Sequence, residues 1–404
     1  MPTACINQSG VRVQLSGERL EVFGHNAQTD RDELLREIPL RDLDRLVISE
    51  SVHFTTPALA AVLRASVPVQ VFSWNGNFLG NFLPAQNHHG LARLQQYRRT
   101  LDSNFALQMA GRIIAAKLYN QRRVLQRLAA SRNYDLGFMN SDLKNDEPSE
   151  APPHERSPLP SSGHPLPLRG GEGTGEGTAQ GDNARSSAWK SSLPKSKIIN
   201  HHSEIRNALT WLDSLFASLQ QSKTIDELRG YEGAATARYF QIWASFLPEE
   251  FPFERRSTRP PLNPVNACIS FGSTILYNET VAFLHAHGLD PALGLLHATE
   301  DGRWSLALDL IEPFRPILVE ALALDLFSHQ ILKTEHFEPK KGGVYLNEEG
   351  RKKFFLQYER RMERQFMSEC VGHRTTLRQQ LEHQAVMFKS GLEEPAKFEP
   401  FLMN

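Results

Sequence analysis

The chain has 404 residues, of which 40% are hydrophobic and 23% are charged, with 45 lysines and arginines against 46 aspartates and glutamates. A chain of this length and apolar content can bury a sizeable core and form more than one domain. The absence of a run of about 18 apolar residues, and of a basic leader before an apolar stretch, argues against membrane-spanning and secreted proteins. The three cysteines lack the short spacing of zinc and redox motifs, so we expect a soluble cytoplasmic protein without membrane contact.

The first 85 residues are predicted to be mostly β. Apolar and polar residues alternate over 11–15 and again over 20–23, with Gly17 between them, which is typical of a hairpin. Two short apolar runs rich in β-branched residues, at 46–48 and 67–72, indicate further strands.

The segments between and after these runs complete the first domain. We expect a short helix over 57–65. Asn75-Gly76 is a turn signal that would return the chain as a strand through 78–83.

After residue 85 the apolar residues recur at spacings of three and four, which predicts helices to the end of the sequence. The clearest helix covers 263–288, with Asn263 as N-cap, Pro264 at the first position and Gly288 at the end. The same grammar predicts a shorter helix beginning after Asp290.

Between about 139 and 197 the helical pattern stops, and 8 of the chain's 24 prolines fall in 141–200. The sequence of 171–174 is repeated by 175–178. Such a stretch cannot bury enough apolar surface to offset the entropy of ordering it. We interpret it as a disordered insertion within one helical domain, with a partner-binding segment as the alternative.

The predicted fold class is therefore α+β with two domains. A small β-rich N-terminal domain covers 1–85. A larger all-α catalytic domain covers 86–404 and is interrupted by the disordered low-complexity insertion at about 139–197.

Glu232 lies on the apolar face of an expected helix over 226–246, in line with Ala235, Tyr239 and Trp243. Burying a lone ionised carboxylate is costly, so we expect it to be protonated, paired with a cation or bound to a metal. An interior salt bridge is the structural alternative to a metal ligand.

Three further residues could complete a metal site. His297 is expected to end the short helix, and Asp309 and Glu312 lie three apart on a following helix that Ser305 could cap. Structural alternatives are a core histidine for His297 and a helix-dipole partner for Asp309. One imidazole with two or three carboxylates suits Mn²⁺ or Mg²⁺, and such an ion can polarise a phosphodiester. The residues alone leave the third ligand open between Asp309 and Glu312.

Basic residues are concentrated in three stretches, at 91–133, 255–259 and 351–364. The first contains nine arginines and lysines against a single acid, Asp102. Such clusters can be solvated helix faces, or they can bind the phosphate backbone of DNA without reading its sequence. The predicted DNA contacts are Arg93, Arg98, Arg99, Arg122, Arg123, Arg255, Arg256 and Arg259.

The motifs around these residues resemble those of the CRISPR-associated integrase of spacer acquisition, the family of Cas protein number one. The resemblance covers nearly the whole chain except the insertion. It rests on LRGYEG at 228–233, NPVN at 263–266, LY at 276–277, GLDP at 288–291, LH at 296–297, SLALDLIE at 305–312, FRP at 314–316, GGVYL at 342–346 and GRKKF at 350–354.

The resemblance implies a β-rich dimerisation domain, a helical catalytic domain and a homodimer that works with the small Cas protein number two. It implies Glu232, His297 and Glu312 as ligands of Mn²⁺ or Mg²⁺, with Asp309 as an accessory catalytic carboxylate. The expected partner is double-stranded DNA, as spacer precursor and as CRISPR repeat. In this family a DNA 3′-hydroxyl attacks a phosphodiester of the repeat, and the same site can cleave DNA.

One departure from the family pattern concerns Pro313, which stands where the family commonly has an acidic residue. We expect it to bend the helix just after Glu312 and to alter the ligand angle. Two other functions remain open at this point: a general repair nuclease acting on branched DNA, and a non-catalytic DNA-binding scaffold whose carboxylates form structural ion pairs.

Overall fold

The computed structural model of the protein divides the chain into two compact units, Met1–Arg127 with Ile198–Asn404, and Leu128–Lys197. The features discussed below belong to the first unit. From residue 143 onward, the predicted insertion lies outside the described residues. The structure describes residues 3–6, 8–26, 30–43, 45–73, 78–84, 89–142, 201–369 and 371–403.

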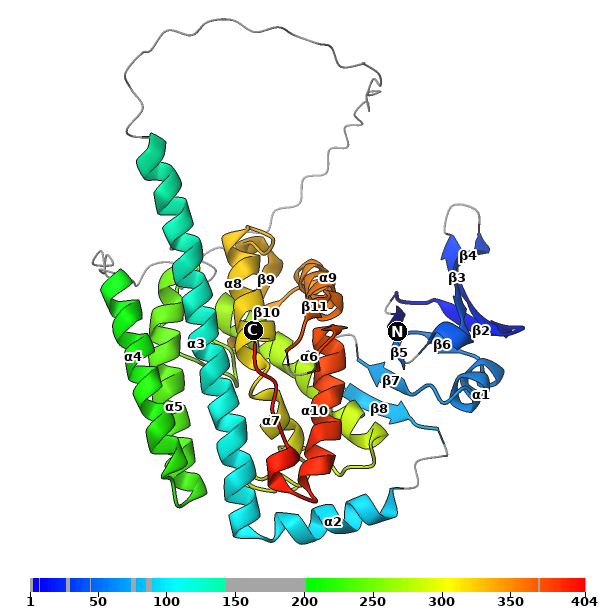
Figure 1. Ribbon diagram of the computed structural model, residues 1–404. Coiled ribbons are helices and arrows are strands. Elements are labelled where there is room, and N and C mark those ends of the chain that lie inside the picture. The colour runs from blue at the N-terminus through cyan, green and yellow to red at the C-terminus, as the bar shows by residue number, and fades with distance from the viewer. Residues whose placement is uncertain are drawn as a thin grey trace, which may run out of the picture. The chain divides into compact units, whose positions relative to one another are not determined.

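Two four-stranded sheets make up the N-terminal part, drawn in blue in Figure 1. Their orders are β1-β5-β7-β8 and β4-β3-β2-β6. Helix α1 (Thr56–Arg64) connects the two halves of a crossover, so that β5 and β7 pair in parallel. The strands are β1 (Thr3–Ile6), β2 (Arg12–Ser16), β3 (Arg19–Asn26), β4 (Arg31–Pro39), β5 (Arg45–Ser49), β6 (His53–Phe54), β7 (Val69–Phe72) and β8 (Phe78–Phe82).

The strand predictions for this part are confirmed. Strands β2 and β3 form the expected antiparallel hairpin, and Gly17 has the positive φ of 59° that its turn requires. Strands β7 and β8 are antiparallel as expected, although the predicted turn at 75–76 lies outside the described residues. The core of this part is apolar, with Val13, Leu20 and Leu46 fully buried.

Helices dominate the rest of the described chain (Figure 1). Apart from residues 128–142, this part falls into the same compact unit as the sheets, so the domain boundary at residue 85 stays a prediction. The helices are α2 (Gly90–Thr100), α3 (Ser103–Asp142), α4 (His201–Gln220), α5 (Ile225–Trp243), α6 (Pro264–Ala286), α7 (Ser305–Ile311), α8 (Ala321–Ser328), α9 (Glu348–Glu363) and α10 (Leu377–Gly391), together with a π-helix over Arg315–Glu320. None of the helices in the described part has the length and hydropathy of a membrane span.

The prediction that this part is entirely α-helical needs a correction, because it also contains two short antiparallel hairpins. Strand β9 (Phe337–Lys340) pairs with β10 (Gly343–Leu346). Lys341 and Gly342 between them both have positive φ, which is the geometry of a two-residue hairpin turn. The second hairpin joins β11 (Phe366–Met367) and β12 (Arg374–Thr375).

Helix α6 follows the sequence closely. The side chain of Asn263 accepts a hydrogen bond from Asn266 N at 2.8 Å, and Pro264 begins the helix. Gly288, with a φ of 73°, lies just after its end. Most of α6 is buried, so it forms the centre of the helical part.

The short helix predicted to run from 291 to His297 is absent, and this segment is irregular. The physical reason is that the backbone N–H groups of Leu295, Leu296 and His297 all donate to the carboxylate of Asp309 instead of to helical carbonyls. The predicted capping role of Ser305 is also wrong. Trp304 occupies the N-cap of α7, and Ser305 Oγ donates to the carbonyl of Ala298 at 2.7 Å.

Candidate metal centre

Helix α5 places Glu232 as the sequence predicts. The side chain of Thr224 caps this helix by accepting from Glu227 N at 3.2 Å. Ala235, Tyr239 and Trp243 are all fully buried, whereas the side chain of Glu232 is 25% exposed at the edge of that face. The carboxylate therefore stands where an apolar helix face meets solvent.

The cation that accompanies Glu232 is Lys117, from helix α3. Its ammonium forms ion pairs with Glu232 Oε1 and with Glu312 Oε2, the latter at 2.5 Å. Thr236 Oγ1 also donates to Glu232 Oε1, at 2.9 Å. The Lys117 side chain is only 3% exposed. Two carboxylates from separate helices thus meet at one buried positive charge.

Lys117 lies in the basic stretch at 91–133 and was not among the residues predicted for the site. A signal was available, because Ile113 and Ile114 lie four and three residues earlier and both are fully buried. A lysine on the same helix face as these residues requires a counter-charge.

Glu312 is held by two cations. Arg315 Nη1 donates to Glu312 Oε1 at 2.8 Å, while Lys117 occupies the other carboxylate oxygen. Burial by itself would raise the pKa of Glu312, but Arg315 and Lys117 outweigh it and lower that pKa to about 2. Although burial opposes the change, Glu312 and Glu232 in turn raise the pKa of Lys117. Glu312, Lys117 and Arg315 are therefore charged at neutral pH.

The helix is interrupted at Glu312, as expected from Pro313. Helix α7 ends at Ile311, with Glu312 as its C-cap, because Pro313 has no N–H to continue the hydrogen-bond ladder. The broken turn is supported by Asn120 of α3, whose amide donates to the Pro313 carbonyl at 2.7 Å.

Asp309 and His297 form the other half of the centre. Asp309 Oδ1 lies 2.6 Å from His297 Nδ1 and accepts from His297 N at 2.9 Å, and Oδ2 accepts from Leu295 N and Leu296 N. The Asp309 side chain is fully buried. Because Asp309 engages Nδ1, the nitrogen that His297 can offer to a ligand is Nε2.

The structure brings together most of the predicted site. Glu232 and Glu312 converge on Lys117, and His297 is near enough to contribute to lowering the pKa of Glu312. Among the described residues, however, no three histidine, cysteine, aspartate or glutamate side chains are gathered as a metal-binding group.

The donor set nevertheless fits a divalent ion. Two carboxylates and an imidazole are ligands that Mn²⁺ and Mg²⁺ accept. The ammonium of Lys117 shows that the point where the two carboxylates meet accepts a positive charge.

The arginines predicted to contact DNA divide into two sets. Arg93, Arg98, Arg255 and Arg259 are exposed. The others take part in the fold: Arg99 donates to the carbonyl of Leu392, Arg122 pairs with Asp213, Arg123 donates to Gln126, and Arg256 donates to Asn266 Oδ1 at 2.6 Å. Burial lowers the pKa of Arg256 to about 10.

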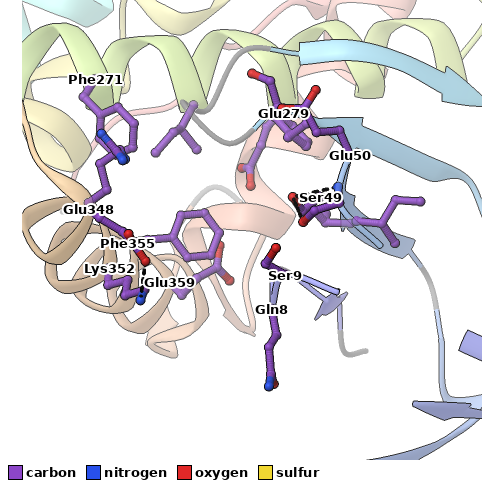
Figure 2. A pocket seen from close by; sticks show the side chains of 17 residues that line it. Gln8, Ser9, Ser49, Glu50, Phe271, Glu279, Glu348, Lys352, Phe355 and Glu359 are labelled. Atoms are coloured by element: carbon purple, nitrogen blue, oxygen red, sulfur yellow. Dashed lines mark hydrogen bonds and ion pairs between the residues drawn. The ribbon is translucent and has the colours of Figure 1, made fainter. Parts of the chain in front are cut away.

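A cavity of about 570 Å³ lies elsewhere, lined by residues at the ends of β5 and β7 and on α6 and α9 (Figure 2). Glu279 on its wall pairs with Arg378 at 3.1 Å and with Arg45 at 3.9 Å. Burial raises the pKa of Glu359 on the same wall. Glu232, His297, Asp309 and Glu312 do not line this cavity, so it is not part of the candidate centre.

The fold and the centre together define a mixed α/β protein with a candidate site of two carboxylates and one imidazole. The sequence profile of the family described as "CRISPR associated protein Cas1" matches residues 4–148 and 185–360. The chain belongs to this family, as its motifs predicted.

Individual relatives extend this finding. The chain is 27% identical over 390 residues to a CRISPR-associated exonuclease Cas4/endonuclease Cas1 fusion of Geobacter sulfurreducens. The matched region covers 95% of this chain but only 56% of the fusion. The chain is also 27% identical over 368 residues to CRISPR-associated endonuclease Cas1 1 of Thermodesulfovibrio yellowstonii, covering 90% of this chain and 92% of the relative.

Two solved structures show the same fold. A casposase bound to its integration product has a TM-score of 0.66 and 20% identity, covering 98% of this chain and 91% of the casposase. A chain of a partial Cas6-RT-Cas1–Cas2 complex has a TM-score of 0.62 and 22% identity, covering 100% of both chains.

Proposed function

We propose that the protein is a metal-dependent DNA integrase and endonuclease of CRISPR adaptation. The observation that carries the proposal is the convergence of Glu232 and Glu312 on one buried cation, beside a histidine fixed by Asp309. Membership of the Cas1 family supports it, as do relatives named as endonucleases and the likeness to a casposase.

In this proposal Glu232, Glu312 and His297 Nε2 hold Mn²⁺ or Mg²⁺. The ion supplies charge neutralisation for a phosphodiester and lowers the cost of charge developing on its oxygens. Asp309 acts as a positioning residue, because its carboxylate fixes both the ring and the backbone of His297.

The proposed reaction is a transesterification on double-stranded DNA. A 3′-hydroxyl of the spacer precursor attacks a phosphodiester of the CRISPR repeat. The attacking hydroxyl gives up its proton as a new P–O bond forms, the P–O bond within the repeat strand breaks, and the released oxygen takes up a proton. With water as the attacking group, the same site cleaves DNA.

The proposed assembly is a homodimer that works with the small protein Cas2, which is named in the complex whose Cas1 shares this fold. Exposed Arg93, Arg98, Arg255 and Arg259 are the candidates for phosphate contacts. Such contacts would make DNA affinity fall as salt rises.

The test measures Mn²⁺-dependent strand transfer from a spacer-like DNA to a target that contains a repeat. Glu232→Gln, His297→Ala and Glu312→Gln should each reduce the rate by at least about 100-fold while folding and DNA binding without metal persist. Glu249→Gln removes an exposed carboxylate and serves as the matched control. Normal strand transfer by any folded variant of the three would contradict the assignment. Equal activity on a simple branched DNA would instead indicate a general repair nuclease.

A non-catalytic DNA-binding scaffold is the second candidate, because Lys117 already pairs with both carboxylates. A scaffold would bind DNA, whereas Mn²⁺ and Mg²⁺ would change neither strand transfer nor the unfolding temperature.

A further inference from the structure

We propose that Lys117 is an internal counter-ion that occupies the place of the divalent cation and couples metal binding to DNA binding. The inference rests on the proposed function and assigns a role to a residue outside the expected ligand set. In the chain without metal, the ammonium keeps two carboxylates paired. When the metal binds, the ammonium leaves them and pairs with a DNA phosphate.

The displacement of a cation by the metal follows from how the carboxylate oxygens of Glu312 are occupied. Both oxygens of Glu312 are already paired with cations, Oε1 with Arg315 at 2.8 Å and Oε2 with Lys117 at 2.5 Å. Glu312 can therefore bind a metal only if one of these two cations gives up its position.

Geometry identifies Lys117 as the cation that leaves. Its ammonium pairs with both Glu232 and Glu312, which are the two carboxylates that would hold the metal. Of the described carboxylates, only Glu312 forms an ion pair with Arg315, whose charge also interacts with those of Glu320 and Glu232. A lysine ammonium is a compact charge on a flexible four-carbon stem, so it can change partners more easily than a planar guanidinium.

The pairing of the displaced ammonium with a DNA phosphate follows from the charge balance of the site. Asp309 is engaged by His297 and by backbone N–H groups, and the other two carboxylates, Glu232 and Glu312, are matched by Lys117 and Arg315. A divalent ion adds two positive charges beside a lysine that is 3% exposed, and uncompensated charge in such surroundings is costly. DNA phosphates supply the missing negative charge, and they are partners to which a displaced ammonium can donate.

The two binding events are therefore expected to favour each other. DNA should tighten metal binding, and the metal should tighten DNA binding by the same factor, because such coupling is reciprocal. Without DNA, the site should bind metal weakly, since the ion must displace an ammonium and leave it without a counter-charge.

The experiment measures Mn²⁺ affinity by electron paramagnetic resonance, with and without a short double-stranded DNA, for the wild type and Lys117→Met. Without DNA the variant should bind Mn²⁺ roughly tenfold more tightly than the wild type, within the usual range of couplings between sites. DNA should tighten binding strongly in the wild type and much less in the variant. Lys117→Arg retains the positive charge and should not gain affinity, and neither should Arg122→Met, which removes a charge elsewhere on α3.

Thermal unfolding gives a second readout. Without metal, Lys117→Met should unfold at a lower temperature than the wild type, because two neighbouring carboxylates lose their cation. Mn²⁺ should raise the unfolding temperature of the variant by more than that of the wild type. Lys117→Gln is measured in parallel, in case the methionine variant does not fold without metal.

Equal Mn²⁺ affinities and equal DNA effects in the wild type and the Lys117 variants would overturn the counter-ion role. Glu232→Gln separates this failure from failure of the proposed function. If it loses Mn²⁺ binding while Lys117→Met changes nothing, the metal centre stands and the counter-ion role falls. If neither the wild type nor Lys117→Met binds Mn²⁺, both proposals fall.

Discussion

The side-chain amide of Asn120 donates a hydrogen bond of 2.7 Å to the carbonyl of Pro313. Asn120 lies three residues after Lys117, so one face of α3 contacts both Glu312 and the peptide that follows it. The same amide donates to the carbonyl of Phe401, and its oxygen accepts from Met403 N. The buried side chain of Asn120 thus connects the helix break beside the candidate centre to α3, and both its amide N–H₂ and its oxygen are hydrogen-bonded.

Asn120→Ala should lower the free energy of unfolding by about 2–3 kcal/mol, because it leaves buried backbone groups without partners. Urea unfolding measures this change. Asn104→Ala, at an exposed position of the same helix, should leave the stability nearly unchanged. Similar stabilities for the two variants would show that the Asn120 contacts contribute little.

Asp309→Asn should weaken Mn²⁺ binding by about 10- to 100-fold, the usual effect of losing a partner behind a metal-binding histidine. An amide cannot accept from the three N–H groups and the ring as the carboxylate does. Calorimetric titration with Mn²⁺ measures the effect, with Asp301→Asn in the neighbouring loop as the control. Unchanged affinity in a folded Asp309 variant would remove the positioning role.

Glu312→Gln should alter how stability depends on pH. The folded-state pKa of Glu312, about 2, lies below its usual value of 4.5, so its ionised form stabilises the fold above pH 4.5. This contribution is lost as the pH falls from 4.5 towards 2. The wild type should therefore exceed the variant in unfolding free energy at pH 7, by about 3 kcal/mol at most, and the difference should narrow below pH 4.5. Urea unfolding at pH 7, 4 and 3 tests this, and a difference that stays constant over the range would contradict it.

The two sets of arginines should behave differently on substitution. The double substitution Arg93→Ala and Arg98→Ala should weaken DNA binding and reduce its salt dependence. The reason is that each exposed arginine that binds a phosphate releases counterions from the DNA. The unfolding temperature of this variant should stay that of the wild type. Arg256→Ala should lower the unfolding temperature instead, because its guanidinium holds Asn266. Fluorescence anisotropy at several salt concentrations measures DNA binding, and thermal unfolding measures stability. Loss of stability in the first variant and loss of DNA binding alone in the second would exchange the roles of the two sets.

Much of the fold could be predicted because local periodicity and capping determine it. The alternation around Gly17 produced the β2–β3 hairpin, and Asn263 with Pro264 marked the start of α6. The helix face of Glu232 was also readable, since Ala235, Tyr239 and Trp243 recur at helical spacing and are buried. These features depend on neighbours within one element.

Features that depend on distant partners could not be predicted in the same way. Nothing near Lys117 in the sequence identifies Glu232 and Glu312 as its counter-ions, because three helices must pack before these groups meet. The segment before His297 has the sequence of a helix start, but the Asp309 carboxylate binds its N–H groups first. In both cases tertiary contacts override the local signal.

The carboxylate of Asp309 recognises only main-chain groups at positions 295 and 296. Any amino acid with an N–H can satisfy that contact, so substitution there is limited by how well the side chain packs. Proline alone is barred chemically, because it has no N–H to donate. In a comprehensive mutational library these two positions would tolerate exchange among apolar residues of similar size, and they would reject proline as firmly as they reject a charge.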